Sequence, residues 1–173
     1  EKWMDEGKEP LKISVNLSKS HFSEDIFFEK KFMPIFQKHR VPANLIEFEI
    51  SESLMMDQEG KLLDFVKKLQ RLGFGCSMDD FGSGYSSLNM LKSLPVTVIK
   101  LDQKMFREEE KERGKIVSRG IIRIAKELNM KVVAEGVETR EYVDFLKEQG
   151  CDMIQGFYFG KPMPVEKFET YMN

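Results

Sequence analysis

Two adjacent carboxylates, Asp79 and Asp80, end an apolar run in the segment CSMDDFGSGYSSL, residues 76–88, and Gly82 and Gly84 follow. Neighbouring residues on a regular strand point to opposite faces, so both carboxylates reach one site only if the strand ends there and the backbone turns. Glycine permits such a turn. A carboxylate pair held in this way can flank two cations that clamp a phosphate oxygen and activate a water molecule.

Other apolar runs of the chain also carry one polar residue near their carboxyl ends. Buried parallel strands usually read as nearly continuous apolar runs, and the carboxyl ends of such strands meet at one rim, where the site lies. Burying several unpaired carboxylates there would be costly, and oxygen ligands of this kind suit Mg²⁺ or Mn²⁺ as the compensating charge. Besides the two aspartates, these residues are Asn16, Glu49, Lys100, Glu135 and Gln155.

Each of these residues also has a simpler explanation. Asp79 and Asp80 could cap the next helix, Glu49 could lie on a solvated edge strand, and Lys100 could extend to solvent at a sheet rim. The two amide side chains could close a turn or satisfy a backbone group. Glu135 is the hardest to explain, because the apolar residues before it in VVAEGVET imply burial. The coincidence of all of them at strand ends favours a shared site.

The elements that position these residues are short strands that alternate with helices. The hydrophobic pattern predicts strands at 12–17, 46–51, 75–80, 98–102, 131–137 and 153–159. It predicts helices at 22–39, 59–72, 86–93, 113–129, 139–149 and 165–171, the fourth with an apolar stripe of Ile116, Ile121, Ile124, Ala125 and Leu128. Repeated strand-then-helix units predict parallel strands with right-handed crossovers, which a doubly wound sheet and an eight-fold barrel both satisfy.

Composition limits the classes of function. The 173 residues suit one domain or a large piece of one, and 41% apolar residues can form a core. A net charge of −2 gives no basic surface for a nucleic-acid duplex, and no apolar run predicts membrane contact by this segment. Cys76 and Cys151 lack metal-ligand spacing and indicate thiols in a reducing compartment, so we expect a cytoplasmic domain, whose intact protein could still be membrane-anchored through upstream segments.

Six motifs, taken in order from about residue 3 to the C-terminus, resemble those of the EAL domain: ISVNLS, EFEISES, DDFGSGYSSL, LPVTVIKLD, VVAEGVET and GCDMIQGFYFGKPMP. Members of this family are cyclic di-GMP phosphodiesterases, or catalytically silent receptors derived from them. The resemblance implies an α/β, TIM-barrel-like fold whose first strand runs antiparallel. It also implies hydrolysis of cyclic di-GMP to the linear dinucleotide by a two-metal mechanism in a bacterial signalling protein.

The resemblance implies metal ligands among the polar residues at strand ends. Asn16, Glu49 and Asp79 would bind one divalent ion, and Asp79, Asp80 and Glu135 would bind a second. We therefore expect two Mg²⁺ or Mn²⁺ ions as cofactors.

Three further residues receive catalytic roles from the resemblance. Lys100 would contact the attacking water, and Gln155 would help to hold that water or the shell of the second ion. Glu52 would tether the loop DFGSGYSS, residues 80–87, which in the family organises the second metal and part of the dimer interface. Cyclic di-GMP and a second copy of the chain are the expected partners, and the substrate-binding residues stay unassigned.

One departure from the family pattern concerns the Glu-Ala-Leu motif, which is absent here. The chain begins near Trp3, which resembles the end of the helix that precedes ISVNLS. We therefore expect residues 1–173 to be the C-terminal three-quarters, approximately, of an EAL domain. About six of eight barrel strands would be present, and one carboxylate of the first metal site would be missing. Such a fragment should hydrolyse weakly or not at all, and the intact protein should carry GGDEF or sensory domains upstream.

Two alternatives stay open. A degenerate EAL domain could bind cyclic di-GMP as a receptor without cutting it, although the retained polar residues argue for a catalytic ancestor. A TIM-barrel lyase or aldolase could use Lys100 as a Schiff base. The many carboxylates expected around Lys100 argue against the desolvated, low-pKa amine that such chemistry needs.

Overall fold

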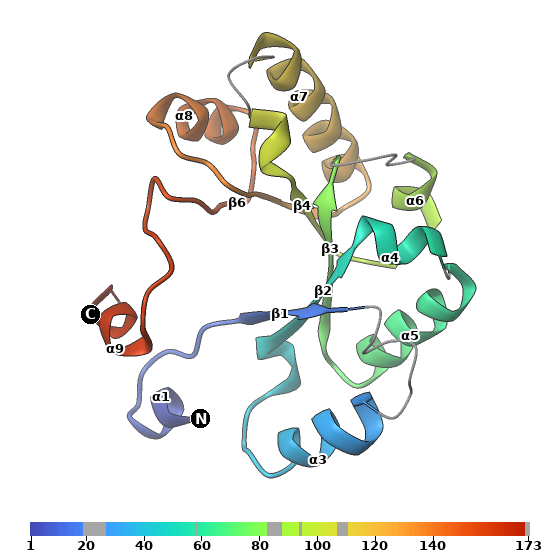
Figure 1. Cartoon of the computed structure of the whole chain (residues 1–173), viewed down its shortest axis with the longest axis vertical. Helices are drawn as coiled ribbons and strands as arrows, with labels where there is room; N and C mark the ends of the chain where they lie inside the picture. The colour runs from blue at the N-terminus through green and yellow to red at the C-terminus, as the bar shows by residue number, and fades with distance from the viewer. Residues whose placement is uncertain (19–26, 58, 83–87, 94, 107–110, 172–173) are drawn as a thin grey trace.

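The structure is a computed structural model that describes residues 1–18, 27–57, 59–82, 88–93, 95–106 and 111–171. In these residues one parallel sheet of six strands runs in chain order, so the carboxyl ends of all its strands meet at one rim (Figure 1). The predicted α/β fold with parallel strands is confirmed. The strands are β1 (Ile13–Leu17), β2 (Ile46–Ser51), β3 (Gly75–Phe81), β4 (Val98–Leu101), β5 (Lys131–Ala134) and β6 (Met153–Ile154).

Helices follow most of the strands, and α3, α5, α7 and α8 surround the outside of the curved sheet (Figure 1). None of the described helices is long and apolar enough to cross a bilayer. The α-helices are α1 (Lys2–Asp5), α3 (Met33–Phe36), α4 (Glu52–Asp57), α5 (Glu59–Arg71), α6 (Leu88–Ser93), α7 (Lys111–Glu127), α8 (Arg140–Glu148) and α9 (Val165–Phe168). A π-helix, η1 (Phe27–Phe32), and the 3₁₀ turns η2 (Ala43–Leu45), η3 (Gln103–Phe106) and η5 (Glu169–Tyr171) complete them.

Several predicted bounds differ from the structure. The strand predicted at 131–137 ends at Ala134, and the one predicted at 153–159 has two residues, because the chain after Ile154 turns and Tyr158 N–H donates to the carbonyl of Val137 instead of joining a ladder. α4 was not predicted, since it begins at Glu52 with no loop after β2. The first predicted helix is helical from 27 to 36, and its residues 22–26 lie outside the described part.

Alternation along β2 separates two sides of the sheet. Phe48 and Ile50 are 2% and 0% exposed and belong to the apolar core under the helices. Glu47 and Glu49 alternate with them and face the inner side, where Lys12 Nζ lies 3.1 Å from Oε2 of Glu47. The inner side of this sheet therefore carries charged residues, and the outer side carries the core.

Aromatic rings hold η1 and α3 onto β2. Phe28 is 1% exposed and meets Phe48, Phe65 and Phe74 edge-on, with ring centroids 6.0, 5.4 and 6.1 Å away. Edge-to-face pairs of this kind add to the free energy of burying the rings themselves. Phe32 continues the cluster against Phe48 at 5.1 Å.

The apolar stripe predicted on α7 divides between core and surface. Ala125 is fully buried and Ile121 packs partly against the core, but Ile116, Ile124 and Leu128 are 64%, 36% and 44% exposed. The buried face of α7 is formed instead by Ser118, Ile122 and Ala125. The helical period was predicted correctly, but the buried face is rotated from the predicted stripe and shares only Ala125 with it.

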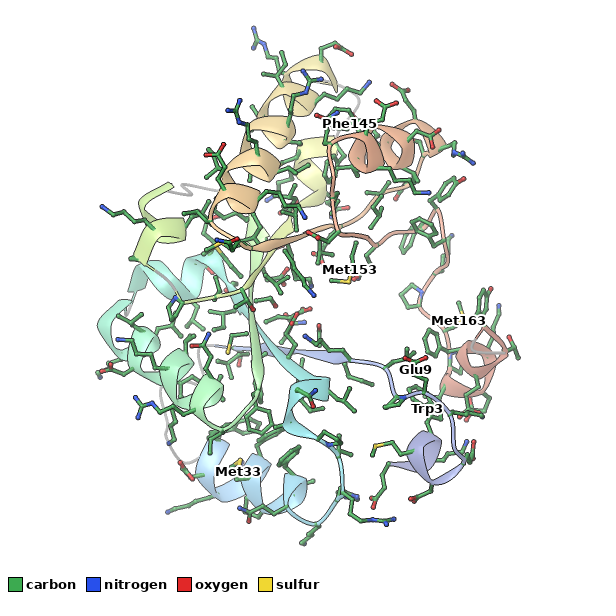
Figure 2. The ribbon with its side chains drawn as sticks, turned by 180° about the vertical axis from the view of Figure 1, so that it is seen from behind. Trp3, Glu9, Met33, Phe145, Met153 and Met163 are labelled. Atoms are coloured by element: carbon green, nitrogen blue, oxygen red, sulfur yellow. The ribbon has the colours of Figure 1, made fainter. Side chains whose placement is uncertain are left out.

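The two outer strands each pair on one side only among the described residues. Ile13 on β1 is 47% exposed, and Met153 on β6 is 49% exposed. In Figure 2 Met153 points into the open part of the sheet, away from Phe145 on α8. Across this open part of the sheet the chain ends meet, because Nε1 of Trp3 donates to Glu169 at 2.8 Å and its ring lies 6.2 Å from that of Phe168.

Candidate active site

Three of the predicted site residues converge around the ammonium group of a fourth, Lys100. Nζ of Lys100 on β4 lies 2.5 Å from Oε1 of Glu49 on β2 and 2.5 Å from Oε1 of Glu135, the residue after β5. Oδ1 of Asp79 on β3 is 3.5 Å from the same nitrogen. Lys100 is 5% exposed and Glu49 7%, so the cluster lies within the rim of the sheet. Carboxylates from three strands therefore share one site.

A bulge near the end of β3 turns Asp79 and Asp80 toward the same side. The pairing of β3 with β4 shifts register between Met78 and Phe81, and Asp80 adopts a left-handed backbone with φ of 57°. The N–H of Asp80 donates to Oδ1 of Asp79 at 3.0 Å. A bulge with one residue in this conformation re-aims the side chain beside it. The predicted turn exists, but Asp80 itself makes it, ahead of Gly82.

Gly82 also has a positive φ, 91°, and a side chain there would collide with Met105. Gly84 and most of the loop that Glu52 is expected to tether lie outside the described residues. Glu52 itself is the first residue of α4 and is 4% exposed.

Asp79, Asp80 and Glu135 form a carboxylate cluster that suits a cation. One oxygen from each lies within 4.8 Å of the others. Burial raises the pKa of Asp80, and the neighbouring charges of Asp79 and Asp102 raise it further. Crowded carboxylate oxygens of this kind match the donors that Mg²⁺ and Mn²⁺ prefer.

The ion pairs around Lys100 do not neutralise the cluster. Burial by itself would lower the pKa of Lys100, but hydrogen bonds to Glu135 and Glu49 outweigh it and raise that pKa well above its usual range. The pKa of Glu135 is also raised, by burial first and then by Asp79 and Glu49, although Lys100 opposes this. Both partners shift upward because three carboxylates share one ammonium. Lys100 is therefore a permanent cation, and the site keeps an excess of negative charge.

Asn16 and Gln155 lie beside this cluster. Asn16 on β1 is in register with Glu49 on β2, and its side chain is exposed at the open edge. Gln155 follows β6, where its backbone N–H donates to Ala134 at 2.8 Å and its carbonyl accepts from Val137 at 3.1 Å. The backbone of Gln155 is therefore fixed against the end of β5, next to Glu135.

A pocket of about 240 Å³ opens next to the carboxylates and is lined by predicted site residues together with residues that the sequence prediction missed. Asp102 is 6% exposed, and its Oδ1 accepts the N–H of Lys104 at 2.7 Å at the start of η3. The signal for Asp102 was present, because it is a second polar residue, after Lys100, at the end of the strand predicted at 98–102. The polar residues lining the pocket are Asp80, Asp102, Gln103, Glu135, Glu138 and Gln155.

The sequence pattern of the EAL domain family matches residues 1–162. This chain belongs to the EAL domain family. It is 38% identical, over 95% of its own length and 24% of the relative's, to the bifunctional diguanylate cyclase/cyclic di-GMP phosphodiesterase MucR of Pseudomonas aeruginosa. The chain spans between 20% and 28% of the length of the curated relatives that it matches. The family predicted from the motifs is thus confirmed.

Solved EAL structures share the fold. The MucR phosphodiesterase in complex with c-di-GMP superposes with a TM-score of 0.87 at 35% identity, over 96% of this chain and 67% of that one. The EAL domain of Mycobacterium smegmatis DcpA gives 0.89 at 29% identity, over 99% and 77%. BlrP1 of Klebsiella pneumoniae, in a manganese/cy-diGMP complex, gives 0.82 at 25% identity, over 93% and 41%. These likenesses confirm the TIM-barrel-like fold of the EAL domain.

Proposed function

We propose that this EAL domain, when intact, hydrolyses cyclic di-GMP to the linear dinucleotide with two divalent ions. The observation that carries the proposal is the convergence of Glu49, Asp79 and Glu135 on Lys100 at one rim, with Asp80 turned toward them by the bulge. The MucR phosphodiesterase and its c-di-GMP complex support the substrate, and the manganese complex of BlrP1 supports the ions.

The donor set fits two ions with shared ligands. Asn16, Glu49 and Asp79 would hold one, and Asp79, Asp80 and Glu135 the other. Bound there, Mg²⁺ or Mn²⁺ would supply a water of lowered pKa and stabilise the attacking and leaving oxygens of the phosphodiester. Three carboxylate oxygens within 4.8 Å of one another support this assignment.

The remaining site residues would orient the attacking water, stabilise the phosphate and support the loop 80–87. Lys100 keeps its proton, because its pKa is raised, so it donates hydrogen bonds to the attacking water or the phosphate and does not act as a base. The same raised pKa argues against a Schiff-base aldolase, which needs a neutral amine. Gln155, fixed beside Glu135, would help to hold the water, and buried Glu52 would support the loop 80–87.

The test is product analysis on an intact domain, completed upstream of residue 1, with Mg²⁺ or Mn²⁺. We expect the linear dinucleotide, and Asp79→Asn should lower kcat/KM on the order of 100-fold or more, about 2.7 kcal/mol of transition-state free energy. Asp144→Asn removes an exposed carboxylate paired with Arg140 and serves as the control. Tight binding of cyclic di-GMP by calorimetry without any product would instead identify a receptor and refute the hydrolase proposal.

A second copy of the chain is the proposed partner at α7. Ile116, Ile124 and Leu128 form an exposed apolar stripe around Gly120, where a second backbone can approach because nothing lies within 4 Å of an added Cβ. In an antiparallel crossing at Gly120, Arg113 of one copy lies opposite Glu127 of the other. Opposite charges at the ends of an apolar stripe support such pairing.

Light scattering on the 173-residue chain tests the dimer. Ile124→Asp should give a monomer, whereas Ile35→Asp, at a 61% exposed position of α3, should leave the dimer intact. Association through the open strand edges would survive Ile124→Asp and would contradict docking at α7.

The cellular setting is also a proposal. The short share of the relatives' length that the chain spans, and the two activities in MucR's name, support GGDEF or sensory domains upstream in the intact protein. Cys76 and Cys151 are both free, and burial raises the pKa of the Cys76 thiol to about 12, which supports a reducing, cytoplasmic location.

A further inference from the structure

We propose that Lys100 competes with the divalent ions for the site's carboxylates, so that filling the site requires its ammonium to leave Glu135. The inference rests on the proposed function, because it takes the ions as ligands of this rim. Lys100 exchanges its carboxylate partners as the ions bind, although it is itself part of the site.

The ion pairs of Lys100 involve members of both proposed ligand sets. Nζ lies 2.5 Å from Glu49 and 3.5 Å from Asp79, which belong to the first set. It lies 2.5 Å from Glu135, which with Asp79 belongs to the second set. Each carboxylate that the ammonium engages is therefore one that a divalent ion would also engage.

Shared carboxylates make the two kinds of cation compete. An ammonium and a divalent ion on one carboxylate oxygen would lie within a few ångströms of one another, where like charges repel strongly in a partly buried site. Lys100 is 5% exposed, so solvent screens this repulsion little. The flexible four-carbon stem of lysine lets the nitrogen swing away while its backbone stays in β4.

The exchange also indicates which groups Lys100 would contact after it leaves the carboxylates. Its hydrogen bonds to Glu49 and Glu135 point across the inner side of the sheet, from β2 to the end of β5. With those carboxylates holding ions, Lys100 would donate instead to a water molecule or to the phosphate of a substrate. Lys100 is thus a cation that stabilises the carboxylates first and the reacting groups afterwards.

Calorimetric titration of the 173-residue chain with Mn²⁺ alone tests the competition without an activity assay. Lys100→Met should bind Mn²⁺ on the order of tenfold more tightly than the wild type. Lys100→Arg keeps the charge and should stay near the wild-type affinity. Lys12→Met is the matched control, because Lys12 also pairs with a buried glutamate, Glu47, on the inner side of the sheet but outside the carboxylate cluster.

The outcomes separate the inference from the function that it rests on. Equal or weaker Mn²⁺ binding by Lys100→Met, with a wild-type chain that does bind Mn²⁺, overturns the competition and leaves the hydrolase proposal standing. Failure of an intact EAL domain of this protein to bind Mn²⁺ at all would overturn both.

A measurement on the wild type covers the case in which Lys100→Met does not fold. Side-chain ¹⁵N NMR resolves lysine ammonium groups, and Mg²⁺ is diamagnetic, so the Lys100 signal can be followed during a titration. We expect that signal to shift as Mg²⁺ binds while that of Lys12 stays in place. A Lys100 signal that does not move at saturating Mg²⁺ would refute the exchange.

Discussion

Glu49 and Glu135 come from strands separated by two others, yet a single ammonium, that of Lys100, lies 2.5 Å from a carboxylate oxygen of each. The inner side of the curved sheet thus brings together residues that are 86 positions apart in the chain. Two carboxylates that close would repel each other without a cation between them. Their closeness makes the charge balance of this site the main determinant of its behaviour.

Asp80→Asn should stabilise the fold while it weakens ion binding. Asparagine tolerates the left-handed backbone of Asp80 and removes a charge that Asp79 and Asp102 repel. Because Asp80 is largely exposed, the gain should be small, about 1–2 °C in Tm at neutral pH. Thermal unfolding in EDTA measures it.

The pH dependence of this gain in stability tests whether the charge of Asp80 is unfavourable in the folded protein. The raised pKa of Asp80 means that its ionised form is disfavoured in the folded state, so the wild type loses stability relative to the variant as the pH rises through that pKa. The advantage of Asp80→Asn should therefore shrink toward acid pH. An advantage that grows toward acid pH would show that the charge at Asp80 is favourable.

Gly136→Ala should destabilise the fold and displace the neighbouring Glu135. Gly136 has φ of 63°, and an added Cβ would lie 2.4 Å from Cβ of Gln103 in η3. We expect a loss of about 1–3 kcal/mol in the free energy of unfolding, together with weaker Mn²⁺ binding because Glu135 must shift. Gly60→Ala, in α5, where the added Cβ meets nothing within 4 Å, should be neutral or stabilise by up to about 1 kcal/mol and leave Mn²⁺ binding unchanged.

Phe28→Ala should unfold the aromatic cluster without touching the rim. The ring is 1% exposed and contacts three other phenylalanines edge-on, so its removal should cost about 3–5 kcal/mol in urea denaturation. A cost below about 1 kcal/mol would mean that η1 does not pack on β2 in solution. Ile35→Ala, 61% exposed on neighbouring α3, is the control and should be nearly neutral.

The 173-residue chain itself should hydrolyse cyclic di-GMP weakly or not at all. Asn16 is exposed at an open edge beside Glu49, and the chain covers 77% of the DcpA EAL domain, so the ligand set around the first ion is expected to need further residues. Product analysis with Mg²⁺ or Mn²⁺ measures this. Turnover at the rate of an intact EAL domain would contradict it.

The parts of the fold that could be predicted from sequence are those in which a local pattern and a packing demand agree. The predicted bounds of β2 match the structure because Phe48 and Ile50 must be buried while Glu47 and Glu49 alternate with them. β6 was predicted too long, since apolar and aromatic residues at 156–159 resemble a strand even though they turn and have no ladder partner.

The site, too, was predictable only in part. Polar residues at strand ends were visible one at a time, and the parallel order of the strands was enough to bring Glu49, Asp79, Lys100 and Glu135 together. Asp102 was missed because only one polar residue was taken from the strand predicted at 98–102, although alternation places Asp102 on the same face as Lys100, two positions earlier. Backbone turns after strands depend on neighbours distant in sequence, which no local pattern reveals.

Trp3 is the single tryptophan of the chain, and it stands where the N-terminal helix meets the C-terminal segment that carries Met163 and α9 (Figure 2). Its indole emission therefore reports the contact between the two ends of the chain. A shift in that emission at low denaturant, before circular dichroism changes, would reveal the loss of this contact while the sheet persists. The fluorescence of Trp3 can therefore follow whether the two ends of the chain stay in contact.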